Sequence, residues 1–125
     1  MELLEGIVAI GERDYAIWYR DMLEELDKYH GKTVMFTGRA LTRRTMPGAF
    51  IIGRHVMTCC ADDITYAGLA CDWSGASTLG LRDWVVITAK ISIGSHKIYG
   101  RKGPVLTVLD LAHSSKPEEE VATFY

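Results

Sequence analysis

Apolar side chains recur every three or four residues between Asp14 and Tyr29. Residues spaced in this way lie on one face of a helix. The pattern predicts a single amphipathic helix with Asp14 as its N-cap, a Glu24–Lys28 ion pair on its surface and a stop at His30-Gly31. The residues that form the apolar face are Tyr15, Trp18, Met22, Leu26 and Tyr29.

From Thr33 onward the apolar positions alternate with polar ones, which is the pattern of β-strands. The clearest run extends from Trp84 to Ile93 and predicts a central strand, with Val85, Ile87, Ala89, Ile91 and Ile93 on one face. Turn residues separate the runs, so we expect five strands, near 33–39, 49–58, 65–71, 84–93 and 104–111. Five short antiparallel strands favour a closed barrel of the OB type, because closure removes exposed strand edges.

The chain has 125 residues, of which 48% are hydrophobic and 24% charged, as expected for a single domain with its own core. We expect an N-terminal segment with the helix (1–30), an OB-like barrel (31–113) and a C-terminal tail (114–125), in which the charged stretch 116–120 is solvated and the packing of the apolar end 121–125 is open. No apolar run approaches the roughly 18 residues that a membrane helix needs. The sequence therefore predicts a mostly β, soluble domain that does not itself insert into a membrane, and it leaves the localisation and the oligomeric state open.

The charge distribution is uneven along the chain. The net charge of −2 and the pI near 6.1 argue against a general polyanion-binding protein. Eight of the 16 acids precede residue 28, however, and no acid occurs between Lys28 and Asp62. Since OB barrels often bind single strands with basic and aromatic side chains, a single-stranded nucleic-acid-binding domain is an alternative function, although the chain's overall charge disfavours a nucleic-acid partner. Its candidate residues are Arg39, Arg43, Arg44 and Arg54.

The segment from Arg54 to Asp63 carries most of the candidate metal and redox chemistry. Cys59 and Cys60 lie within it and Cys71 follows eleven residues later, so all three cysteines of the chain fall in this region. Thiolate, imidazole and carboxylate groups together are typical zinc ligands, which makes Cys59, Cys60, Cys71, Asp62 and His55 a candidate zinc site. The spacing is not that of a usual structural zinc site, and buried cysteines that pack in the core are the alternative.

Strand geometry restricts this candidate site. In an extended strand, His55 and Cys59 lie on one face, whereas Arg54 and Cys60 lie on the other. One ion could therefore bind both paired cysteines only if the chain bends there, and Cys71 would join them only if a hairpin brought it back.

Sequence motifs of catalysis are absent from the chain. It has no nucleophile elbow, phosphate-binding loop or His-Glu-x-x-His pattern, and adjacent acids such as Asp62-Asp63 are more typical of a turn than of a catalytic pair. The sequence therefore predicts a non-enzymatic binding domain with no catalytic residues. A thiol redox protein that uses Cys59 or Cys60 is an alternative.

The paired-cysteine segment, with Gly68-Leu69 and Cys71 after it, resembles the C-terminal domain of the DUF1980 family of uncharacterised bacterial proteins of the permease-subunit type. The resemblance extends from about residue 29 to 125, and an aromatic residue is more usual where this chain has His55. It implies an OB-like domain of unproven function that serves as an accessory part of a membrane permease system, with a permease subunit as partner. The other matching stretches are Gly31-Lys32-Thr33-Val34, Gly38, Asp83-Trp84-Val85 and Gly103-Pro104-Val105-Leu106.

Overall fold

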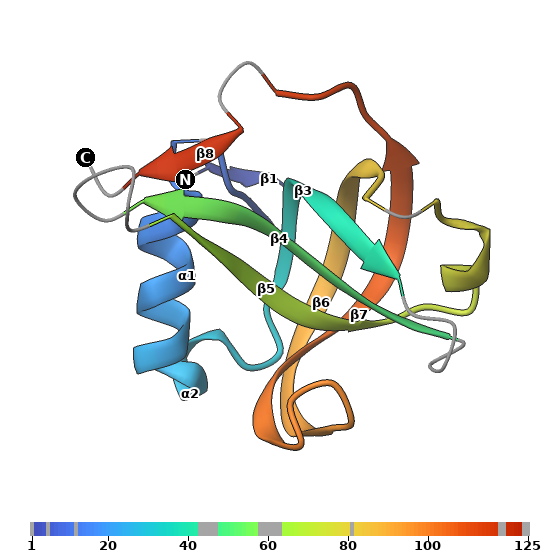
Figure 1. Ribbon diagram of the computed structural model, residues 1–125. Helices are drawn as coiled ribbons and strands as arrows, with labels where there is room; N and C mark the ends of the chain where they lie inside the picture. The colour runs from blue at the N-terminus through green and yellow to red at the C-terminus, as the bar shows by residue number, and fades with distance from the viewer. Residues whose placement is uncertain are drawn as a thin grey trace.

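The structure is a computed structural model that describes residues 2–4, 6–11, 13–42, 48–57, 64–80, 82–117 and 120–123. Within these residues most of the chain is in β-strands, which surround one core (Figure 1). The elements in chain order are β1 (Glu2–Leu4), β2 (Ile7–Ala9), α1 (Tyr15–Glu24), α2 (Leu26–Tyr29), β3 (Thr33–Thr42), β4 (Ala49–Met57), β5 (Thr65–Asp72), the short 3-10 turn η2 (Ala76–Thr78), β6 (Trp84–His96), β7 (Arg101–His113) and β8 (Val121–Thr123).

Strands β3 to β7 form a closed barrel. β3 pairs with β4, β4 with β5, β5 with β7, β7 with β6, and β6 with β3 again, so the circle is complete. Only the β5–β7 contact within this circle is parallel. This is the Greek-key order of the OB fold, and it confirms the five-stranded OB-like barrel predicted from the sequence.

The alternating apolar residues of the strands fill the barrel. On β6, Val85, Ile87, Ala89 and Ile91 are fully buried, and this strand lies between β3 and β7 as expected of a central strand. β6 continues to His96 and β7 begins at Arg101, so that their hairpin turns only at 97–100. The two strands are therefore longer than the sequence pattern indicated.

Helix α1 packs against the barrel with the apolar face that the sequence predicted. Tyr15, Trp18 and Met22 are buried, and the Trp18 ring lies 5.3 Å from that of Phe36 on β3. The predicted single helix is interrupted at Glu25, whose backbone leaves the helical region, and α2 follows. Asp14 makes no side-chain capping hydrogen bond.

The helix surface also differs from the prediction in one ion pair. Lys28 Nζ lies 3.0 Å from the Asp21 carboxylate and 3.5 Å from that of Glu25, in place of the expected pair with Glu24. The break at Glu25 changes the relative position of residues on its two sides, which accounts for the exchange of partners.

Three short strands were not predicted. β1 and β2 form a hairpin whose second strand joins β3 in parallel, and β8 joins β4 in parallel at His55–Met57. The sequence left open whether the apolar end of the chain packs on the domain, and in the structure β8 packs on the barrel and buries Ala122. Each strand has only three residues, which is too few to show a period of two.

Gly53 marks the point at which β4 changes its neighbours. β4 pairs with β3 up to Gly53 and with β8 from His55 onward. A Cβ atom at Gly53 would clash with the backbone carbonyl of Ala67 on β5. The absence of a side chain therefore allows β4 and β5 to approach each other closely where Gly53 pairs with Gly68.

Candidate functional site

The structure separates His55 from Cys71. His55 is partly buried on the outer face of β4, where it pairs with Tyr66 and the two rings lie 5.3 Å apart. Cys71 is fully buried on the inner face of β5, opposite Phe50. Cys71 is five residues beyond Tyr66, which corresponds to about 17 Å along a strand. These two members of the predicted zinc site therefore do not come together.

Strands β4 and β5 do form a hairpin, as the sequence suggested. Its register, however, pairs Val56 with Thr65 near the connection and Phe50 with Cys71 at the opposite end. The hairpin therefore carries Cys71 away from the connecting segment rather than back to it. The other predicted ligands, Cys59, Cys60 and Asp62, lie outside the described residues.

Cys71 has the properties of a core residue. Its thiol is fully buried and makes a long contact of 3.8 Å with the carbonyl oxygen of Leu69. Burial raises the pKa of the Cys71 thiol well above its ordinary value, and the neighbouring carboxylate of Asp72 adds to the shift. Over the part of the chain that the structure describes, no three His, Cys, Asp or Glu side chains form a group that could hold a metal ion.

The arginines of the nucleic-acid alternative have different environments. Arg54 is only 1% exposed, so it is not available to a phosphate backbone outside the barrel, whereas Arg39 is partly buried on the outer face of β3. Their guanidinium carbons lie 5.9 and 5.2 Å, respectively, from the centre of the Trp84 ring. Arg43 and Arg44 lie outside the described residues.

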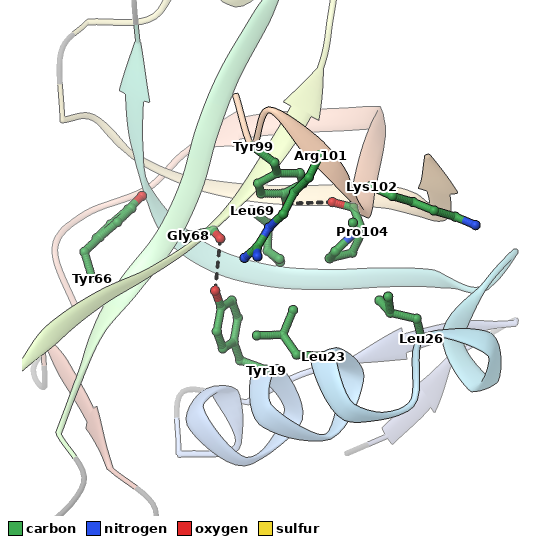
Figure 2. A pocket seen from close by; sticks show the side chains of 11 residues that line it. Tyr19, Leu23, Leu26, Tyr66, Gly68, Leu69, Tyr99, Arg101, Lys102 and Pro104 are labelled. Atoms are coloured by element: carbon green, nitrogen blue, oxygen red, sulfur yellow. Dashed lines mark hydrogen bonds between the residues drawn. The ribbon is translucent and has the colours of Figure 1, made fainter. Parts of the chain in front are cut away.

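A pocket of about 470 Å³ opens between the helices, β5 and the hairpin of β6 and β7 (Figure 2). Its lining combines three tyrosines, several apolar side chains and two basic ones. The helices contribute Tyr19, Leu23 and Leu26; β5 contributes Tyr66, Gly68 and Leu69; and the hairpin contributes Tyr99, Arg101, Lys102, Gly103 and Pro104.

Tyr99 lies in the wall of this pocket, at the place where β5 and β7 begin to pair. Its hydroxyl donates a hydrogen bond to the carbonyl of Pro104 at 2.6 Å and accepts one from the N–H of Ala70 at 2.8 Å. The first residue pair of the parallel ladder is Ala70 with Val105, so the hydroxyl bridges the two strands just where they separate.

The other two tyrosines also use their hydroxyls on the backbone. Tyr19 donates to the carbonyl of Gly68 at 3.2 Å, and Tyr66 donates to the carbonyl of Arg39 at 2.7 Å. Burial raises the pKa of Tyr19 and Tyr66 above the ordinary value and that of Tyr99 to about 12. All three side chains are therefore neutral near pH 7.

The turn beside the pocket is fixed by His96. Its Nδ1 atom accepts a hydrogen bond from the backbone N–H of Ile98 at 3.1 Å, so the proton of the neutral ring is on Nε2. Nε2 lies 2.8 Å from the carboxylate of Asp72 at the end of β5. This side chain therefore connects the 97–100 turn, which carries Tyr99, to β5.

The sequence did not indicate this pocket. Its walls come from three segments far apart in the chain, and several of its residues belong to helix and strand patterns that predict core packing. One local signal was present in the sequence, because two cations, Arg101 and Lys102, lie close to the apolar Pro104. That signal alone does not identify a site.

The closed barrel defines a small domain with an OB-like fold. The family model of the DUF1980 C-terminal domain matches residues 3–122, and the chain belongs to this family. A solved structure with a similar fold is the small single-stranded DNA-binding protein from Streptomyces coelicolor, with a TM-score of 0.37 and 12% identity, covering 67% of this chain and 94% of that chain. No curated protein matches the chain.

Among the described residues, no helix combines the length and the apolar character that crossing a membrane requires.

Proposed function

We propose that this chain is a non-enzymatic binding domain and that the pocket between α1, β5 and β7 holds a small amphipathic anion. The observation that carries the proposal is the lining itself, in which apolar and aromatic side chains lie beside two cations and no acid. The volume is typical of a site for a small molecule.

The apolar part of a ligand would lie on the helix side of the pocket. Leu23 is 45% exposed although it is a large apolar residue, and it lies beside Tyr19 and Leu26. Covering this surface with an apolar group would contribute roughly 25 cal/mol for each Å² removed from water. Pro104 provides the opposite wall (Figure 2).

The anionic part would lie at the start of β7. Arg101 and Lys102 are exposed at the pocket, and none of the described residues that line it is Asp or Glu. Glu24, Glu25 and Asp27 line the neighbouring pocket, which shares Lys102. The ligand's negative charge would therefore meet two cations beside a surface of low polarity. The net charge of the chain is −2, so this local excess of positive charge is not a consequence of overall composition.

The same lining supports binding rather than catalysis. The described residues that line the pocket include no His, Cys, Ser, Asp or Glu, and the three tyrosine hydroxyls already make hydrogen bonds to the backbone. General acid or base catalysis requires a group whose pKa lies near the working pH. The raised tyrosine pKa values do not meet this condition.

We also propose that the domain is an accessory part of a membrane permease system, with a permease subunit as its partner. This proposal depends on the character of the family and not on the pocket. It can be tested by mixing the purified domain with detergent-solubilised candidate permease subunits from the same organism. Co-elution in size-exclusion chromatography would support the proposal, and separate elution at micromolar concentrations would refute it.

The pocket can be tested with two fluorescent probes that differ only in charge. Anilinonaphthalene sulfonate carries an anionic group, and phenylnaphthylamine is the same molecule without it. We expect the sulfonate to bind more tightly. The double variant Arg101→Gln plus Lys102→Gln should weaken its binding about five- to tenfold, because each exposed charge pair contributes up to about 1 kcal/mol. Binding of the neutral probe should not change.

Two further variants control this experiment. Lys97→Gln removes a cation from the same turn but outside the pocket lining, so it should leave both probes unaffected. Leu23→Asn should weaken both probes equally, because it changes the apolar wall. Circular dichroism verifies that each variant is folded. An unchanged sulfonate affinity in the double variant, or an equal loss in Lys97→Gln, would refute the proposed site.

A further inference from the structure

A second cationic site lies on the other side of Tyr66 from the pocket. Arg39 on β3 and Trp84 on β6 are register partners on the outer face of the barrel, and the Tyr66 hydroxyl is bonded to the Arg39 carbonyl. We propose that Arg39 and Trp84 bind one anionic group, a phosphate or a carboxylate. This inference is independent of the proposed function of the pocket.

The first argument is that two hydrogen-bond donors at this position have no acceptor. The Nε atom of Arg39 and the indole Nε1 atom of Trp84 are both covered from solvent without a hydrogen-bond partner. A covered donor without an acceptor costs roughly 1–3 kcal/mol, so native proteins rarely leave one in place. An oxyanion offers several lone pairs and could accept from both groups after small movements of the two side chains.

The second argument is that two positively charged guanidinium groups lie close to the Trp84 ring. The guanidinium carbons of Arg39 and Arg54 both lie within 6 Å of the centre of the Trp84 ring. The face of an indole ring attracts cations, but it does not accept their in-plane hydrogen bonds. An anion at the edge of the Arg39 guanidinium would provide both the negative charge and the acceptors.

The third argument is that the carboxylate next in sequence is engaged elsewhere. The Asp83 side chain precedes Trp84, but it accepts a hydrogen bond from the backbone N–H of Gly80 at 2.8 Å and lies 3.2 Å from His113. Among the salt bridges between residues that the structure describes, none includes Arg39. Among these described residues, the Arg39 guanidinium therefore has no carboxylate partner.

The position also permits access from solvent. Arg39 and Trp84 are partly buried side chains on the outside of the barrel, whereas Arg54 is almost completely covered. A ligand would therefore approach the terminal nitrogens of Arg39 from outside. Arg54 would contribute through its charge near the ring.

Nuclear magnetic resonance can test this site with inorganic phosphate as the probe. The chain has three tryptophans, so three indole N–H signals are expected, and Trp84→Phe identifies the one of interest. Titration with phosphate should shift the Trp84 signal saturably, compared with sodium chloride at the same ionic strength. The signal of the fully buried Trp18 should not move and serves as an internal reference.

Arg39→Gln should weaken phosphate binding about tenfold or more, since a charge-assisted hydrogen bond is lost. Lys90→Gln is the matched control. Lys90 is exposed on the same face of β6, six residues and about 20 Å from Trp84, and its loss should change the affinity less than twofold. Trp84→Phe retains an aromatic ring but lacks the indole N–H donor. The Arg39 Nε–H signal should therefore still respond to phosphate, with weaker affinity.

A parallel titration with acetate distinguishes the two sources of the anionic group. A saturable shift with acetate at lower concentration than with phosphate assigns the site to carboxylates, and the reverse assigns it to phosphates. If neither ion gives a saturable shift, or if Arg39→Gln binds as well as the wild type, the inference is wrong. In that case the Arg39–Trp84 contact serves only packing. The pocket experiment is unaffected by either outcome.

Discussion

The Tyr99 hydroxyl, which bridges β5 and β7 at the pocket, should contribute measurably to the stability of the domain. Tyr99→Phe removes one oxygen atom and leaves the ring in place. That oxygen donates to the Pro104 carbonyl at 2.6 Å and accepts from the Ala70 N–H at 2.8 Å. Ala70 and Pro104 are both buried, so the substitution leaves two backbone groups in the barrel wall without their partner.

The expected loss in the free energy of unfolding is about 2–3 kcal/mol. A buried backbone group without a partner costs roughly 1–3 kcal/mol. Two such groups would together cost about 2–6 kcal/mol, but the pocket beside Tyr99 would allow water to reach one of them, which reduces the total to the lower part of this range. For a domain of this size, such a loss corresponds to a decrease in Tm of roughly 6–12 °C.

Equilibrium urea unfolding, followed by far-ultraviolet circular dichroism, measures this loss. Tyr19→Phe is the matched control, because it removes a hydroxyl from the same pocket. The Tyr19 hydrogen bond to Gly68 is longer, at 3.2 Å, and only partly buried, so its loss should cost less than about 1 kcal/mol. The reasoning fails if Tyr99→Phe unfolds within about 0.5 kcal/mol of the wild type, or if the two variants are equally destabilised.

Three further predictions concern the β4–β5 hairpin and the segment that connects its strands. Gly53→Ala should destabilise the domain by about 3 kcal/mol or more in the same urea experiment, because its Cβ would meet backbone atoms of β5. Gly94→Ala is the control. A Cβ at Gly94 would have nothing within 4 Å, so this variant should remain within about 1 kcal/mol of the wild type. The buried Cys71 thiol, with its raised pKa, should not react with a thiol reagent at pH 8 until the protein unfolds. If the protein purifies with zinc, metal analysis should find the zinc retained in Cys71→Ala and lost in the double variant Cys59→Ser plus Cys60→Ser. Loss of zinc in Cys71→Ala would contradict the inference that the hairpin register carries Cys71 away from the connecting segment.

The barrel strands could be predicted from the sequence because their signal is local. Alternation along β6 places Val85, Ile87, Ala89 and Ile91 on one face without any knowledge of their partners, and all four are buried in the core. The three-residue strands β1, β2 and β8 could not be found in this way, since their pairing with β3 and β4 depends on the folded barrel. The break of the helix at Glu25 likewise has no marker such as glycine or proline.

The convergence of Arg39, Arg54 and Trp84 was equally inaccessible to sequence reasoning. Arg39 meets Trp84 because β3 and β6 pair in one particular register, although more than 40 residues separate them in the chain. No local pattern fixes such a register. The sequence did identify Arg39 and Arg54 as candidate anion-binding residues, but it treated both as parts of one exposed basic surface, and the structure buries Arg54.

The position of Cys71, in contrast, could have been derived from the sequence alone. In an antiparallel hairpin, two residues that pair lie equally far from the turn on either side. With β4 ending near residue 57 and β5 beginning near 65, Cys71 must pair close to residue 50, and it does so with Phe50. A cysteine can return to the turn only if it follows the turn closely, and Cys71 does not. The three-cysteine motif is therefore better evidence of family membership than of one metal site. The proposed ligand site is the tyrosine-lined pocket, and Cys71, the cysteine that the structure describes, is not among its lining residues.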